Sequence, residues 1–95
     1  MLTHEQICSA VQKVAEIYPI QKVSYFGSYA DGNATEDSDL DLLVEFNPNQ
    51  KISLFEVSGV KIDLEDILKI PVDVIALPIP EGAFIEINKE IFVYG

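Results

Sequence analysis

Apolar side chains recur every three or four positions from Ile7 to Tyr18, which is the spacing of one face of an α-helix. Thr3 and Gln6 stand three residues apart just before this stripe, and this capping-box pattern favours a helix start. Pro19 follows the stripe and stops it. The pattern therefore predicts an amphipathic first helix whose apolar face packs on the rest of the chain.

Three short segments are rich in β-branched, aliphatic and aromatic residues and are predicted to be strands. They span residues 23–26, 40–46 and 71–77. In the second segment apolar residues alternate with Asp41 and Glu45, so one face is expected to be core and the other partly wet. Proline residues directly after position 77 end the third segment, because proline has no amide hydrogen to donate to a neighbouring strand.

A second long helix is expected between the second and third strands. Ser53 fits its N-cap, and the helix should run to about Leu68, although Gly59 weakens its middle. Its expected core positions are Phe55, Val60, Leu64, Ile67 and Leu68. A last helix is expected over residues 84–90, and the apolar residues 91–94 fit either the end of that helix or a short strand.

This order of elements predicts an α/β fold, with a small mixed sheet of at least three strands flanked by helices mainly on one side. Acidic side chains are expected on the open face of the sheet. At 95 residues, without repeats or a linker, the chain is expected to form a single domain over residues 1–95. The N-terminus does not have the pattern of a signal peptide and no apolar run reaches membrane-spanning length, so a cytoplasmic protein without a membrane partner is expected.

The charge balance is strongly acidic. The formal net charge is -10, all six basic residues are lysines, and the chain has no arginine. Binding to nucleic acid requires a cationic face that displaces phosphate counterions, so direct nucleic-acid binding is disfavoured. A metal ion or a basic protein partner fits this composition better.

Three aspartates stand where strands are predicted. Asp39 and Asp41 lie two residues apart at the start of the second strand, so both should point to the same face. Asp73 lies inside the third strand, which should be a neighbour in the same sheet. Carboxylates this close raise one another's pKa unless a cation lies between them. Three oxygen ligands suit Mg²⁺, and one or two such ions would serve an in-line displacement at phosphorus.

Gly27 and Ser28 follow the first predicted strand and open a turn or a helix. Backbone amides at such a start suit a phosphate group. Ten residues separate Ser28 from Asp39. A phosphate-holding corner and a metal site are therefore predicted next to each other.

The Gly27-Ser28 pair, the ten-residue gap and the Asp39-x-Asp41 pair resemble the motif of the minimal nucleotidyltransferases (MNT proteins) of the polymerase-beta superfamily. The resemblance covers nearly the whole chain and implies a polymerase-beta-like nucleotidyltransferase fold. It implies that Asp39, Asp41 and Asp73 are catalytic and bind Mg²⁺, with Asp73 also activating the acceptor hydroxyl. It also implies that Gly27 and Ser28 hold the outer phosphates of ATP.

Stand-alone MNT proteins of this size resemble the antitoxins encoded beside HEPN-domain toxins. The implied function is transfer of AMP from ATP to a tyrosine of a HEPN-type partner. A module of the same fold that neutralises its partner by binding alone is the alternative. Transfer to a small cationic acceptor such as an aminoglycoside is a third possibility, and the sequence is compatible with an oligomer.

One position departs from the family pattern. Relatives commonly read Gly-Ser-x-Ala-Arg-Gly, whereas Asp31 stands here in place of the arginine. Bidentate clamping of phosphate by arginine is therefore unavailable to this chain. Charge neutralisation would fall to metal ions and to Lys22 or Lys51, so weak nucleotide affinity or a residue contributed by the partner is expected.

Simpler interpretations of the same residues remain open at this point. Asp73 also fits an edge residue turned to water, and Tyr29 fits either contact with the nucleotide or packing. A calcium loop beginning at Asp37 fails, because Leu42 stands where an EF-hand needs glycine and Pro48 where it needs glutamate. One histidine and one cysteine do not make a zinc cluster.

Overall fold

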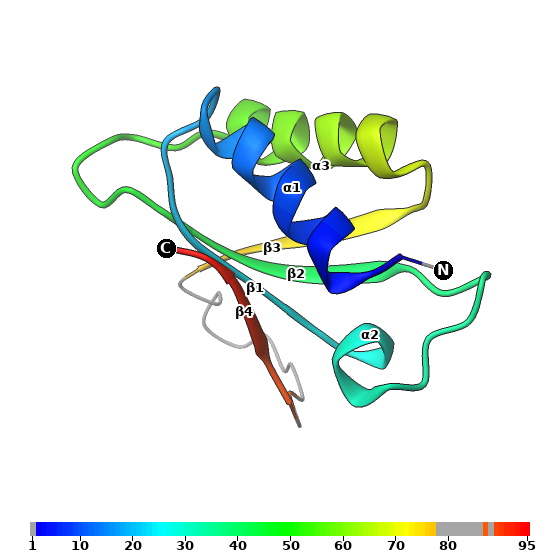
Figure 1. Cartoon of the computed structure of the whole chain (residues 1–95). Coiled ribbons are helices and arrows are strands. Elements are labelled where there is room, and N and C mark those ends of the chain that lie inside the picture. The colour runs from blue at the N-terminus through cyan, green and yellow to red at the C-terminus, as the bar shows by residue number, and fades with distance from the viewer. Residues whose placement is uncertain (1, 78–86, 88) are drawn as a thin grey trace.

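The structure, a computed structural model, describes residues 2–77, 87 and 89–95. It is a four-stranded mixed sheet in the order β3-β2-β1-β4, with α1 and α3 side by side on one face (Figure 1). The predicted α/β fold is confirmed. The helices are α1 (His4–Ala15), α2 (Ser28–Asp31) and α3 (Leu54–Leu68), and the strands are β1 (Ile20–Phe26), β2 (Leu40–Phe46), β3 (Val72–Leu77) and β4 (Ile91–Tyr94).

The strand directions determine which residues meet at each end of the sheet. β1 is antiparallel to both β2 and β4, whereas β2 and β3 are parallel. The last residue of β1, Phe26, therefore lies at the same end as the first residues of β2, β3 and β4, which are Leu40, Val72 and Ile91. We call this end of the sheet the carboxylate end.

Both long helices begin as the sequence predicts. Thr3 and Gln6 form the capping box of α1, and Ser53 and Glu56 form that of α3. The core lies between these helices and the sheet. Its fully buried side chains include Ile7, Val11, Val14, Val23, Leu40, Leu42, Val44, Val60, Leu64 and Val72.

Two expected core positions of α3 were wrong. Phe55 is 88% exposed and Ile67 is 40% exposed. The buried stripe of the helix is Val60, Leu64 and Leu68, spaced by four residues. Each residue turns the helix by about 100°, so Phe55 lies on the opposite side from this stripe. Apolar content alone did not determine which face is buried.

The C-terminal segment is a strand. Of the helix expected over residues 84–90, positions 84–86 and 88 lie outside the described residues, and Ile87, Lys89 and Glu90 are not helical. Residues 91–94 form β4, which pairs with β1 and runs away from the carboxylate end. Glu90, the residue directly before β4, accepts a hydrogen bond from the Ser24 hydroxyl. This bond holds the start of β4 against the buried middle of β1.

The two ends of the chain lie at opposite ends of the sheet (Figure 1). Near the N-terminus, Nδ1 of His4 lies 3.0 Å from the hydroxyl of Tyr25, close to where β1 ends. Near the C-terminus, Tyr94 pairs with Val23 in the first half of β1. Within the described residues, no helix combines the length and apolar character needed to cross a bilayer.

Gly59 lies within the continuous helix α3, where the helix passes close to Tyr18. A Cβ placed on Gly59 would lie 2.4 Å from the Tyr18 hydroxyl oxygen, which donates a 3.0 Å hydrogen bond to Asp63. Alanine normally stabilises a helix by about 1 kcal/mol relative to glycine. Here we expect Gly59→Ala to lower the free energy of unfolding by about 1 kcal/mol, because overpacking displaces the Tyr18 ring.

Urea unfolding checks this expectation, with Ser58→Ala as the matched control. Ser58 is the preceding, exposed residue of the same helix, so its replacement should be neutral or slightly stabilising. A Gly59→Ala variant as stable as Ser58→Ala would show that Tyr18 moves aside without cost.

Candidate functional site

Two of the three predicted aspartates lie side by side. Asp41 of β2 and Asp73 of β3 are direct register partners on neighbouring parallel strands. Both belong to the open face, because Leu40 and Leu42 on either side of Asp41 point into the core. Asp41 is half-buried and Asp73 is exposed. The parallel pairing thus brings together carboxylates that are 32 residues apart in the chain.

The surroundings of Asp41 disfavour its negative charge. Burial raises the pKa of the Asp41 carboxyl, and the negative charges of Asp73 and Asp39 and a hydrogen bond with Asp73 raise it further. Each of these causes acts against the ionised form. A cation next to Asp41 would remove the repulsion, so the site has the electrostatics of an acidic metal site.

Asp39 stands one residue before β2 and is exposed, and its influence on the Asp41 pKa shows that its charge is near. Within residues 2–77, 87 and 89–95, however, no three acidic, histidine or cysteine side chains already converge on one point in a geometry for a metal ion. Mg²⁺ is usually held by one or two carboxylates together with water and substrate phosphates. The oxygen donors of Asp41 and Asp73 fit that requirement.

Gly27 brings the backbone directly against Asp41. Its φ of 72° and ψ of -149° lie in a region that is essentially restricted to glycine. A Cβ on Gly27 would lie 2.4 Å from Oδ2 of Asp41. Ser28 then begins the single turn α2, which the buried Ala30 anchors to the core. The predicted Gly-Ser corner and the aspartate pair are therefore adjacent.

The side chain of Tyr29 is half-buried and packs against the core cluster. This contact favours the packing role for Tyr29 over contact with a nucleotide. Asp31, at the end of α2, is exposed.

Lys22 and Lys51 do not lie near the aspartates, so the expectation that one of them neutralises phosphate charge was wrong. Lys22 pairs with Glu45, four residues along β2 from Asp41, which is about 13 Å in a strand. Lys51 follows the far end of β2. Neither side chain spans that distance.

Lys89 is an exposed residue just before β4 at the carboxylate end, because Ile91 pairs with Tyr25 on antiparallel strands. Ile91 packs against the core, whereas Glu90 accepts a hydrogen bond from Ser24 on the other side of the sheet. Alternation along the chain therefore favours the helix-covered face for Lys89, away from Asp41 and Asp73.

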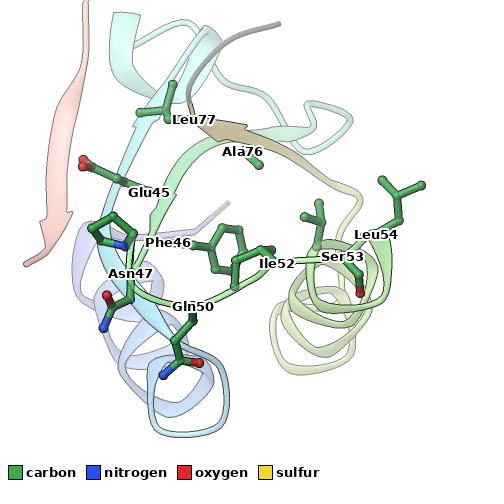
Figure 2. Close-up of a pocket in the computed structure, with 11 residues that line it drawn as sticks. Glu45, Phe46, Asn47, Gln50, Ile52, Ser53, Leu54, Ala76 and Leu77 are labelled. Carbon is green, nitrogen blue, oxygen red and sulfur yellow. The ribbon is translucent and has the colours of Figure 1, made fainter.

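A groove of about 940 Å³ lies at the opposite end of the sheet. It is formed by the last residues of β2 and β3, the turn after β2 and the start of α3, and Figure 2 shows Phe46 and Ile52 near its centre. Its lining includes Glu45, Ala76 and Leu77 but none of the three aspartates. The groove is separate from the candidate site.

Comparison with known proteins agrees with this geometry. The profile of the family described as "Nucleotidyltransferase domain" matches residues 7–94. Protein adenylyltransferase MntA of Thermococcus cleftensis is 35% identical over 79 residues, which are 79% of this chain and 78% of that protein. A relative in Methanocaldococcus jannaschii is 43% identical over 58 residues, which are 61% of this chain, and the match spans only 58% of that relative's length.

Solved structures share the fold. A toxin-antitoxin crystal structure with AMP-PNP superposes with a TM-score of 0.71 at 20% identity, covering 99% of this chain and 74% of the other. A tri-AMPylated Shewanella oneidensis HEPN toxin in complex with its MNT antitoxin gives a TM-score of 0.65 at 17% identity, covering 98% and 73%.

Proposed function

This chain belongs to the nucleotidyltransferase domain family, and from that premise we propose that it is the antitoxin of a toxin-antitoxin pair. In this proposal it transfers AMP from ATP to a tyrosine hydroxyl of a HEPN-domain toxin in an Mg²⁺-dependent reaction. The observation that carries the proposal is the pairing of Asp41 with Asp73 directly against the Gly27 backbone. The name of the Thermococcus relative and the toxin complexes that share the fold support the choice of acceptor.

Each residue of the site has a distinct role in the proposed reaction. Asp41 and Asp73, joined by the exposed Asp39, would hold Mg²⁺, which supplies charge neutralisation at the phosphates when bound. The backbone at Gly27 and Ser28 would orient the outer phosphates. Because Asp73 is exposed, an acceptor hydroxyl could reach it and give up its proton there. The acceptor oxygen then bonds to the α-phosphorus, and pyrophosphate leaves.

The experiment that tests this function is transfer of label from ATP to the partner. The purified protein is incubated with Mg²⁺, ATP labelled at the α-phosphate and the HEPN-type product of the neighbouring gene. Labelled partner is expected, and replacement of its acceptor tyrosine by phenylalanine should abolish the label. A partner that carries no label after incubation with Mg²⁺ and labelled ATP would contradict the proposal.

Neutralisation by binding alone is the second candidate function. The observation that favours it is Asp31, an acid where relatives commonly carry the arginine of the motif. A double Asp39→Asn, Asp41→Asn variant separates the two functions, since a pure binder should protect cells from the toxin as well as the parent does. Loss of protection with retained complex formation would assign the effect to chemistry.

A further inference from the structure

An ion pair on α3 holds the backbone at the start of β3. The Val72 amide donates to Oε2 of Glu65 at 3.0 Å, and the Val72 carbonyl accepts from Nζ of Lys61 at 2.7 Å. Lys61 and Glu65 also contact each other at 3.2 Å. Two side chains one helical turn apart thus satisfy both backbone groups of one strand residue.

The direction of these groups explains why they need side-chain partners. β3 stands at the edge of the sheet order, with β2 on its other side. The Pro71 carbonyl accepts a 3.0 Å hydrogen bond from the Leu40 amide, so the backbone of Pro71 faces β2. Successive residues of a strand face opposite sides, so the amide and carbonyl of Val72 point away from β2, toward the edge of the sheet. There the Lys61–Glu65 pair takes the place of a neighbouring strand. The hydrogen bond from the Val72 amide and the contact with Lys61 lower the pKa of Glu65, so the fold favours its ionised form.

Asp73 follows Val72 directly, and it lies against Asp41. The two like charges repel, and the repulsion acts on the last strand of the sheet order, which is paired to a strand on one side only. A hydrogen-bonded anchor one residue away from Asp73 opposes that movement. The exposed ion pair between Lys69 and Asp66, at 3.6 Å on the same end of α3, has no such contact with β3 among the described residues.

We propose that Lys61 and Glu65 are positioning residues that hold Asp73 beside Asp41 in the geometry required for the divalent cation. The inference rests on the proposed function of the two aspartates as metal ligands. It assigns to a helix on the covered face of the sheet a role in a site on the open face.

The decisive variant is Lys61→Met, tested with Mn²⁺ as a probe of the metal site. By charge alone, removal of a cation should strengthen Mn²⁺ binding to an acidic site. By positioning, it should weaken Mn²⁺ binding about 10-fold, since partners that orient ligands contribute roughly 10- to 100-fold to metal affinity. The opposite signs separate the two explanations. Binding is measured by calorimetry on the whole chain, in the presence and absence of a non-hydrolysable ATP analogue.

Glu65 provides two further variants. Glu65→Ala removes the hydrogen bond to the Val72 amide, the contact with Lys61 and one negative charge, so it should weaken Mn²⁺ binding more than Lys61→Met does. Glu65→Gln keeps an oxygen that accepts from the Val72 amide, so it should restore part of the affinity. Lys69→Met is the matched control for loss of a lysine, and it should bind Mn²⁺ at least as tightly as the parent.

A folded Lys61→Met variant that binds Mn²⁺ as tightly as the parent, or more tightly, overturns the positioning role. Should Glu65→Ala fail to fold, the comparison of Lys61→Met with Lys69→Met still decides, because Lys61→Met keeps the hydrogen bond between Glu65 and Val72. A parent protein that binds no Mn²⁺ even with the nucleotide analogue overturns the proposed function itself, which is a different outcome.

Discussion

Asp41→Asn is expected to abolish nucleotidyl transfer while making the metal-free protein more stable. Loss of a carboxylate that neutralises a cation at the phosphates removes several kcal/mol of transition-state stabilisation, so activity should fall at least about 10³-fold. The gain in stability follows from the raised pKa of Asp41, which means that its ionised form is unfavourable in the folded state. Asparagine keeps the shape of the side chain and removes the charge.

The sign of the pH dependence can be worked out from this shift. A carboxyl whose pKa is raised on folding stabilises the protein below its unfolded pKa, and that contribution is lost as pH rises through the folded pKa. At pH 7 the ionised Asp41 carboxylate therefore lowers the stability of the parent, and Asp41→Asn should have the higher Tm. Below about pH 3.5 the carboxyl is protonated in both states and the difference should vanish.

Thermal unfolding in chelator at several pH values, with transfer assays at neutral pH, measures both effects. Asp37→Asn is the matched control, because Asp37 is an exposed carboxylate in the preceding loop and should affect neither Tm nor activity. Adding Mg²⁺ should raise the Tm of the parent and leave that of Asp41→Asn nearly unchanged. An Asp41→Asn variant less stable than the parent at pH 7 would contradict the electrostatic account of this site.

Gly27→Ala is expected to damage both stability and activity, through a single added methyl group. The methyl carbon would lie 2.4 Å from Oδ2 of Asp41, and the φ of 72° is strained for any residue with a side chain. Strain and displacement together should lower the free energy of unfolding by about 2 to 3 kcal/mol. Because the displaced atom belongs to the proposed metal ligand, transfer should fall at least about 100-fold.

Gly32→Ala separates the two causes. Gly32 also has a positive φ, of 79°, but a Cβ there would have no neighbour within 4 Å. It should cost about 1 kcal/mol for the backbone and leave the activity of the folded protein intact. Urea unfolding and transfer assays on both variants measure this difference. If the two variants lose activity equally, close contact with Asp41 is not what position 27 contributes.

Some parts of this structure follow from signals within one segment of the sequence, and others depend on which strands pair with each other. β2 has the predicted bounds, residues 40–46, because its apolar residues at every second position lie within the strand itself, although Leu43 interrupts the polar side. The capping boxes of α1 and α3 are likewise local signals. β1 begins at Ile20, earlier than predicted, because Ile20 pairs with Phe46 across the sheet. Such a partner is invisible in the segment itself.

The candidate site follows the same division. The motif found Gly27 and the aspartates, because residue type and spacing carry the chemistry. It did not find Lys61 or Glu65, since their relation to the site depends on the path of α3 over the start of β3. The choice of Lys22 and Lys51 failed for the same reason, because proximity in sequence does not give position along a strand.

The placement of the two termini bears on how the protein should be handled in the laboratory. The first residues of α1 sit beside Tyr25 at the carboxylate end, whereas β4 carries the chain away toward the first half of β1. A purification tag fused ahead of α1 would start at the same end of the sheet as the aspartates, on the helix-covered face. A tag or fluorophore attached after Gly95 starts at the far end, so kinetic measurements belong on the C-terminally tagged protein.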